Sequence, residues 1–193
     1  MALGATIYHF DIQPSHVDRG VYEALAVKAA RHPSEAEDYL LAPVLAYCLE
    51  FTEGLSFSRG LAEPDEPALA VRDLTGELRA WIDVGTPDAA RLHKAAKAAP
   101  RVAVYTHKAP EALLRPLKGE RIHRGEAIEL YAFDRDIIDG LVARLERRMA
   151  FDLSVTDDHL FLSLDGATLS GDLQRLAINR DRVISTRRRN GSS

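Results

Sequence analysis

The sequence predicts one α+β (or α/β) domain with a mixed sheet, helices packed on that sheet and extra strands near both ends of the chain. Three observations support this prediction. The chain has 193 residues, of which 46% are hydrophobic and 28% charged, as is typical of one folded domain. Alternation of apolar and polar residues, as in strands, recurs along the chain. Between these segments, apolar residues recur at helical spacing.

The N-terminal part predicts extended chain followed by one long helix. Residues 5–12 alternate as a strand does, and residues 21–30 fit either a strand or a short helix. Ser34 and Glu37 have the spacing of a capping box at the start of the long helix. Gly54 is expected to follow the end of this helix.

A β-hairpin is expected in the middle of the chain, because Thr75-Gly76 predicts a tight turn between strands over 68–74 and 77–84. Its neighbours are a strand over 55–59, a helix over 87–99 capped by Thr86, and a strand over 101–106. Together with the long helix, these elements give the order helix, three strands, helix, strand.

The C-terminal part predicts two more helices and three more strands. Their expected ranges are a helix over 110–117, a strand over 126–133, a helix over 134–148 capped by Asp134, and strands over 150–155 and 159–164. We expect one domain over residues 1–178. Residues 179–193, with Arg187, Arg188 and Arg189, predict a solvated basic tail.

Composition narrows the function classes. The net charge of −4 and the pI near 6.0 are unlike those of a general nucleic-acid binder, so contact with nucleic acid would require a local basic patch or a metal. The single cysteine, Cys48, excludes an intrachain disulfide and fits a small core residue in a reducing compartment. Neither a signal peptide nor a run of about 20 apolar residues is evident, so we expect a cytoplasmic protein without a membrane partner.

Asp83 is the first candidate functional residue, because aspartate is uncommon in strands and a partly buried carboxylate needs a partner. The hairpin brings the start of its first strand beside the end of its second, so Asp65 or Glu66 is expected to approach Asp83. Carboxylates held close together repel unless a cation neutralises them. Mg²⁺ prefers oxygen ligands, and such a site can hydrolyse phosphodiesters.

Three more residues fit this hypothesis. Arg91 and Lys94 are three residues apart, and therefore share one face of the helix that follows Asp83. A lysine there can orient an attacking water or hold a phosphate. Glu35, at the start of the long helix, would add a third carboxylate.

Structural alternatives remain open for each of these residues. Asp83 could form a salt bridge with Arg59 or Arg79, and Lys94 could belong to a solvated helix face. Glu35 could act through the helix dipole alone. His32 could serve as a general base or simply form a hydrogen bond where the helix begins.

Several strings of residues add a resemblance. They are Met1–Tyr8, Arg31–Glu35, Ser58–Leu61, Asp65–Pro67, Trp81–Asp88 and Arg91–Ala95. Together they resemble the YaeQ family of bacterial proteins, from residue 1 to about residue 173. The resemblance implies a fold similar to the PD-(D/E)XK nuclease superfamily, with a restriction-endonuclease-like αβββαβ core.

The same resemblance implies roles for individual residues. Asp65 would match the first aspartate of the superfamily, Asp83 its second acid, and Glu35 the acid of the first core helix. The superfamily lysine stands two residues after the second acid, where this chain has Gly85, so Lys94 would supply the amine from the next helix.

Two functional hypotheses follow. In the first, Glu35, Asp65 and Asp83 bind Mg²⁺ or Mn²⁺, and Asp65, Asp83 and Lys94 form the catalytic set of a nuclease acting on nucleic acid. The supporting arginines Arg31, Arg59 and Arg91 would bind phosphate or pair with the acids. In the second, a non-catalytic binding or regulatory module retains the nuclease-like scaffold, and basic residues neutralise the acids in place of a metal.

Overall fold

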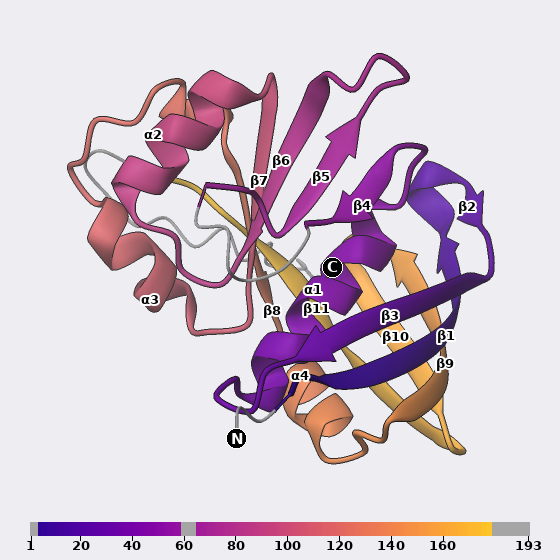
Figure 1. Ribbon diagram of the computed structural model, residues 1–193. Coiled ribbons are helices and arrows are strands. Elements are labelled where there is room, and N and C mark those ends of the chain that lie inside the picture. Colours follow the sequence, from indigo (N-terminus) through magenta and orange to yellow (C-terminus); the bar gives the residue numbers. More distant parts are fainter. Residues whose placement is uncertain (1–3, 59–64, 179–193) are drawn as a thin grey trace, which may run out of the picture.

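The computed structural model describes residues 4–58 and 65–178, which form a mixed α+β structure (Figure 1). The strands are β1 (Thr6–His16), β2 (Val21–Tyr22), β3 (Leu25–Arg31), β4 (Leu55–Phe57), β5 (Leu69–Arg72), β6 (Leu78–Val84), β7 (Arg101–Thr106), β8 (Glu129–Phe133), β9 (Arg148–Thr156), β10 (His159–Leu164) and β11 (Ala167–Leu176). The helices are α1 (Glu37–Glu50), α2 (Ala89–Ala98), α3 (Pro110–Leu114) and α4 (Arg135–Val142), with 3-10 turns η1 (Val17–Arg19), η2 (Arg115–Leu117) and η3 (Gly125–Ala127).

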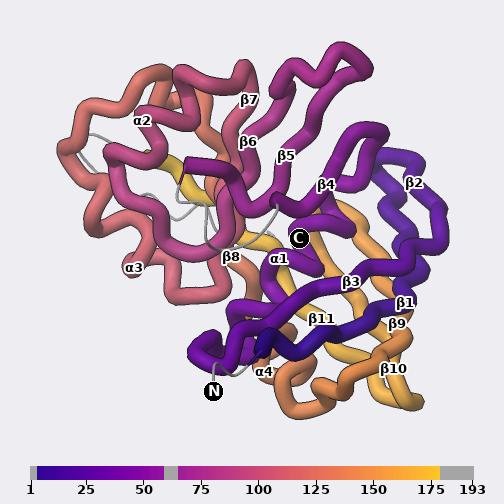
Figure 2. Tube along the Cα trace, in the orientation of Figure 1, coloured from indigo at the N-terminus to yellow at the C-terminus, as the bar shows by residue number. Residues whose placement is uncertain are grey.

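All of these strands belong to one curled mixed sheet. Its order is β2-β1-β9-β10-β11-β8-β7-β6-β5-β4, and β3 pairs with β1 outside this path. The pairs β1/β9, β6/β7 and β7/β8 are parallel, whereas the others are antiparallel. The tube in Figure 2 shows how the sheet curls, so that its two ends face different directions.

The strand β11 joins the two parts of the sheet. Its first half pairs with β10, from Ala167 to Asp172, and its second half pairs with β8, from Leu173 to Leu176. Sequence analysis did not predict this strand.

The predicted order of elements in the middle of the chain is confirmed, because α1 is followed by β4, β5, β6, α2 and β7. The predicted hairpin is also present: β5 pairs antiparallel with β6, with Leu69 opposite Ile82 and Ala70 opposite Trp81. The turn between these strands is held by Asp73, whose Oδ1 accepts from the N–H groups of Thr75 and Glu77 at 2.9 and 3.0 Å.

Helices cover both faces of the β6–β7 region. Helix α1 packs inside the curl and is buried almost all round, which explains why apolar residues occupy most of its length. Helices α2 and α3 cover the opposite face, where Leu92 and Leu113 share a second apolar cluster with Trp81. Along β6, Ile82 and Val84 therefore face α1, whereas Trp81 faces α2.

Several predicted helix ends were wrong. Helix α1 begins at Glu37, and Ser34 bonds to His32 instead of capping the helix. Helix α2 is capped by Asp88 rather than Thr86, because the Asp88 carboxylate accepts from the Arg91 N–H at 2.8 Å. Helix α4 has the predicted Asp134 cap, but ends at Val142.

Residues 21–30, which fitted either type of element, are extended in β2 and β3. None of the described helices is long and apolar enough to cross a lipid bilayer.

Candidate functional site

The site begins with Asp83 near the carboxyl end of β6. Its side chain is only 3% exposed, and both of its oxygens bond to one guanidinium: Arg91 Nε donates to Oδ2 and Nη2 donates to Oδ1, each at 2.7 Å. This two-point geometry is the strongest form of carboxylate–arginine pairing. Hydrogen bonding to Asp83 raises the pKa of Arg91, so the guanidinium remains charged.

Arg91 connects three parts of the fold. Besides binding Asp83, its Nη2 donates to the Glu66 carbonyl at 2.7 Å, and its guanidinium carbon lies 5.5 Å from the centre of the Trp81 ring. The Asp88 cap fixes the start of α2, and therefore the position of Arg91 above β6. Arg91 thus links β6, α2 and the segment before β5.

Asp65 meets the same helix one turn further on. Its carboxylate accepts a hydrogen bond from Lys94, and the two side chains are 79% and 49% exposed. The bond to Lys94 lowers the pKa of Asp65, which keeps the carboxylate ionised. Arg91 and Lys94 are three residues apart and therefore lie on one face of α2. Asp83 and Asp65 both meet this face, but Asp83 pairs with Arg91 and Asp65 pairs with Lys94.

Glu35 does not complete an acidic pocket with them. Its Oε2 accepts from the His32 N–H at 2.9 Å, which gives His32 the helix-entry role left open by the sequence. The pKa of Tyr39 is raised, first by burial and then by the negative charges of Glu35 and Asp83. Tyr39 therefore lies near both of these carboxylates.

The candidate metal ligands Asp65 and Asp83 are paired with basic side chains in this structure. Carboxylate oxygens are suitable donors for Mg²⁺, but both oxygens of Asp83 and one oxygen of Asp65 are bonded to basic side chains. Among residues 4–58 and 65–178, no three acidic, histidine or cysteine side chains cluster closely enough to hold one metal ion.

The supporting arginines have separate positions. Arg31 donates to the Glu35 carbonyl at 2.9 Å and lies 3.7 Å from the Glu37 carboxylate, so it braces the start of α1. Arg79, an alternative partner for Asp83, pairs instead with Asp73 at 2.6 Å. Arg59 lies outside the described residues.

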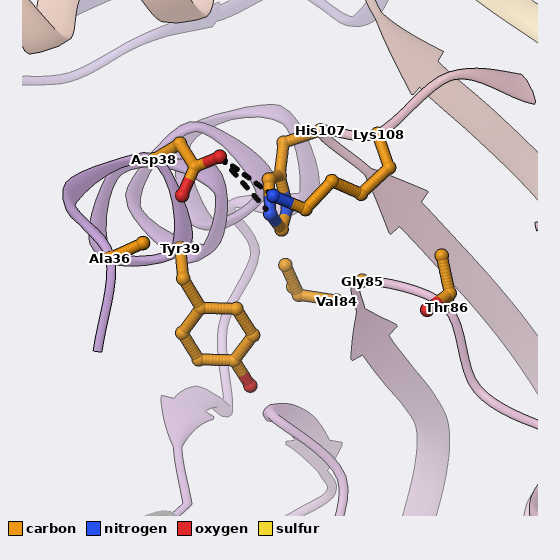
Figure 3. A pocket seen from close by; sticks show the side chains of 8 residues that line it. All are labelled: Ala36, Asp38, Tyr39, Val84, Gly85, Thr86, His107 and Lys108. Atoms are coloured by element: carbon orange, nitrogen blue, oxygen red, sulfur yellow. Dashed lines mark hydrogen bonds and ion pairs between the residues drawn. The ribbon is translucent and has the colours of Figure 1, made fainter. Parts of the chain in front are cut away.

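A cavity of about 320 Å³ lies beside this site, at the carboxyl ends of the parallel strands β6 and β7. It is lined by Ala36, Asp38, Tyr39, Val84, Gly85, Thr86, His107 and Lys108 (Figure 3). Gly85 has a φ of +103°, which favours glycine, and a Cβ there would lie 3.8 Å from Cε2 of the Tyr39 ring. The space beside Tyr39 would accept a Cβ, so glycine is favoured here by the backbone conformation.

Asp38 is the charged centre of this cavity. Lys108 Nζ donates to its Oδ2 at 2.8 Å, and His107 Nε2 lies 3.7 Å from the same oxygen. Burial lowers the pKa of His107, so the imidazole is neutral near pH 7. Within the described part of the chain, the buried atoms Asp38 Oδ1 and His107 Nδ1 have no hydrogen-bond partner.

Sequence analysis missed Asp38, Tyr39 and His107 as candidate site residues. A usable signal was present for His107, which directly follows the buried strand β7, where open α/β sheets place ligand-binding residues. For Asp38 no such signal existed, because an acid in the first turn of a helix is ordinary.

The fold and the site define an α+β protein with a curled mixed sheet, in which a buried carboxylate–guanidinium pair lies at the carboxyl end of a central strand. The chain belongs to the YaeQ family: the family model described as "YaeQ protein" matches residues 1–172.

Relatives with the same description occur in several bacteria. The chain is 29% identical over 174 residues to "Uncharacterized protein YaeQ" of Escherichia coli (strain K12), which covers 90% of this chain and 96% of the relative. It is 36% identical over 107 residues to "Uncharacterized protein YaeQ" of Salmonella typhi, covering 55% of this chain and 59% of the relative.

Two solved structures are similar along most of the chain. The crystal structure of YaeQ protein from Pseudomonas syringae has a TM-score of 0.78 at 29% identity, covering 91% of this chain and 98% of that one. The crystal structure of YaeQ protein from Xanthomonas axonopodis pv. citri has a TM-score of 0.77 at 29% identity, covering 89% and 97%.

Proposed function

We propose that this protein is a non-catalytic binding or regulatory module on a nuclease-like scaffold. The observation that carries this proposal is the two-point pair between Asp83 and Arg91, in which both oxygens of the candidate metal ligand already bond to a guanidinium. A carboxylate neutralised in this way needs no metal ion to offset its burial.

The second ion pair supports the same function. Lys94, the residue that would orient water or hold phosphate in an enzyme, bonds to Asp65. The α2 face therefore balances two acids with two basic residues. Gly85, at the position where the nuclease superfamily has its lysine, also favours a site that has lost catalysis.

Calorimetric titration with Mn²⁺ tests this proposal. The wild-type protein and an Asp65→Ala variant should give the same small heats, because the Asp83 carboxylate is paired with Arg91 and the Asp65 carboxylate is bonded to Lys94. Asp65 is a suitable choice because its exposed side chain can be removed without disturbing the core. A saturable heat in the wild type that disappears in Asp65→Ala would contradict the proposal.

A second candidate function is Mg²⁺- or Mn²⁺-dependent hydrolysis of phosphodiesters in nucleic acid. It is favoured by the element order α1-β4-β5-β6-α2-β7, which agrees with the αβββαβ order of that superfamily, and by the meeting of Asp65 and Asp83 on one helix face. In this function Glu35, Asp65 and Asp83 would bind the metal. Lys94 would position water or phosphate, and Arg91 would bind phosphate once released from its carboxylate.

Cleavage assays separate the two candidates. Purified protein is incubated with single-stranded and duplex DNA and RNA in the presence of Mn²⁺, with EDTA as the matched control. The binding module predicts no metal-dependent cleavage. Cleavage that requires Mn²⁺ and is lost in both Asp65→Ala and Lys94→Gln would instead establish the enzyme.

A further inference from the structure

Charge is distributed very unevenly along this chain. Residues 89–125 contain nine lysines and arginines but only two glutamates, a net charge of +7, so the remainder of the chain carries −11. The overall charge of −4 conceals this separation. A strongly basic region in an acidic protein satisfies the condition for local attraction of a polyanion.

The basic residues of this region gather on two adjacent elements, α2 and the segment 115–124. His123 N–H donates to His93 Nδ1 at 3.2 Å, and Arg124 donates to the Ala99 carbonyl at 2.9 Å, which fastens the segment to the helix. Leu117 also shares the apolar cluster of α2. Both views place α2 and α3 on the same side of the molecule (Figures 1 and 2).

We call five exposed lysine and arginine side chains of these two elements the basic face; they are Lys94, Lys97, Arg115, Lys118 and Arg121. The exposed Arg124 is not included, because it bonds to backbone carbonyls. Lys94 is bonded to Asp65. The other four form no ion pair with any residue in 4–58 or 65–178. Even with the exposed Glu120 in the same segment, these four cations give the two packed elements a net positive charge.

We propose that the basic face binds the phosphodiester backbone of nucleic acid. Lysine and arginine contacts to phosphate release condensed counterions, which supplies sequence-independent affinity. The partner is not a lipid surface, because the large apolar side chains exposed in the described chain, Ile7, Val17, Tyr22, Leu74 and Phe161, lie on other elements. A membrane-binding face normally adds such side chains to its charges.

This inference deepens the proposed function by naming the partner class, and it rests on that function only in assuming that the protein binds a ligand. The basic face also explains how an acidic protein meets nucleic acid, since most of the negative charge lies outside residues 89–125. Four phosphate contacts predict that log K falls with log salt at a slope of about −3.6 for duplex DNA and about −2.8 for single strands.

Fluorescence anisotropy with labelled duplex and single-stranded oligonucleotides, in EDTA and over a range of salt concentrations, tests the proposal. The variant Lys97→Gln/Arg121→Gln should bind at least about tenfold more weakly at low salt, with its slope on duplex DNA reduced by about 1.8. The matched control Lys28→Gln/Arg147→Gln removes two exposed cations from other elements, and should bind within about twofold of the wild type.

Equal weakening in both variants would show that net charge alone drives binding, and would overturn the assignment to this face. Absence of binding by the wild type at low salt, or tighter binding to vesicles of anionic lipid, would overturn the nucleic-acid partner. Because EDTA is present throughout, these results are independent of the Mn²⁺ titration. The nucleic-acid proposal can therefore be refuted while the proposal that Asp65 and Asp83 bind no metal is upheld, and the reverse is also possible.

Discussion

Replacing Asp83 by asparagine tests whether the Asp83–Arg91 pair is structural. The substitution keeps the shape of the side chain, but removes the charge that balances Arg91. Breaking a buried pair by removing one partner typically costs about 3–5 kcal/mol, because the other charge is left uncompensated. The Arg91 side chain is 28% exposed, so water can solvate part of its charge. We therefore expect a loss of about 3 kcal/mol.

For a chain of this size, a loss of about 3 kcal/mol lowers Tm by roughly 6–12 °C. Urea unfolding followed by circular dichroism would measure the change in free energy directly, because the midpoint shifts while the slope stays constant. Asp65→Asn is the matched control. It removes a carboxylate from the same helix face, but from an exposed pair that contributes little to stability.

The sign of the change is informative. A metal site held ready in a strained, repulsive state becomes more stable when one of its acids is neutralised. If Asp83→Asn matched or exceeded the wild type in stability, the structural role of the pair would be refuted and a cation-binding role favoured.

Three further predictions concern other parts of the fold. Gly54→Ala should strongly lower the unfolding midpoint, since φ there is +82° and the added Cβ would lie 2.0 Å from the Arg72 carbonyl oxygen; Gly76→Ala, where no atom lies within 4 Å, should cost only about 1 kcal/mol. Burial lowers the pKa of His107 below 6.5, so the unfolded chain binds more protons than the folded protein as the pH falls. Stability measured by urea unfolding should therefore fall as the pH drops below about 6.5, and should fall less in His107→Gln. Cys48 is buried and its thiol pKa is raised to about 12, so a thiol reagent should label it in denaturant but not in the native protein.

Local patterns in the sequence predicted much of the fold. Alternating residues and the Thr75-Gly76 turn identified the β5–β6 hairpin, and the same reasoning placed β7 at its observed bounds. Such elements can be predicted because their conformation is determined mainly by residues close together in the sequence. The predicted starts of α1 and α2 were wrong because several nearby polar side chains compete to cap a helix. Ser34 bonds to His32 instead of capping α1, and Asp88 caps α2 in place of Thr86.

The strand β11 escaped prediction for a different reason. Its residues include Gly171 and several polar side chains, which give weak strand propensity. Pairing with β10 and β8 stabilises the strand, and these partners come from separate parts of the chain. Such tertiary stabilisation is invisible in a local pattern.

The candidate site was predicted in part. The hairpin register predicted that Asp65 or Glu66 would approach Asp83. In the structure, Arg91 bonds to Asp83 and to the Glu66 carbonyl, and Lys94 bonds to Asp65. The partner of Asp83 was not foreseen as Arg91, because the sequence shows which face an arginine occupies but not how far its side chain reaches. Glu35 was assigned from its place in the helix, although the hydrogen bond to His32 directs its carboxylate elsewhere.

The position of β11 also has a consequence for biosynthesis. This strand is the last element described, and it bridges β10 and β8, so neither neighbour has its full set of partners until residues 167–176 have left the ribosome. The nascent chain must therefore wait with two unpaired strand edges, which are templates for aggregation. Closure of the sheet is expected to be a late step in folding, and a chain that terminates before β11 should be insoluble.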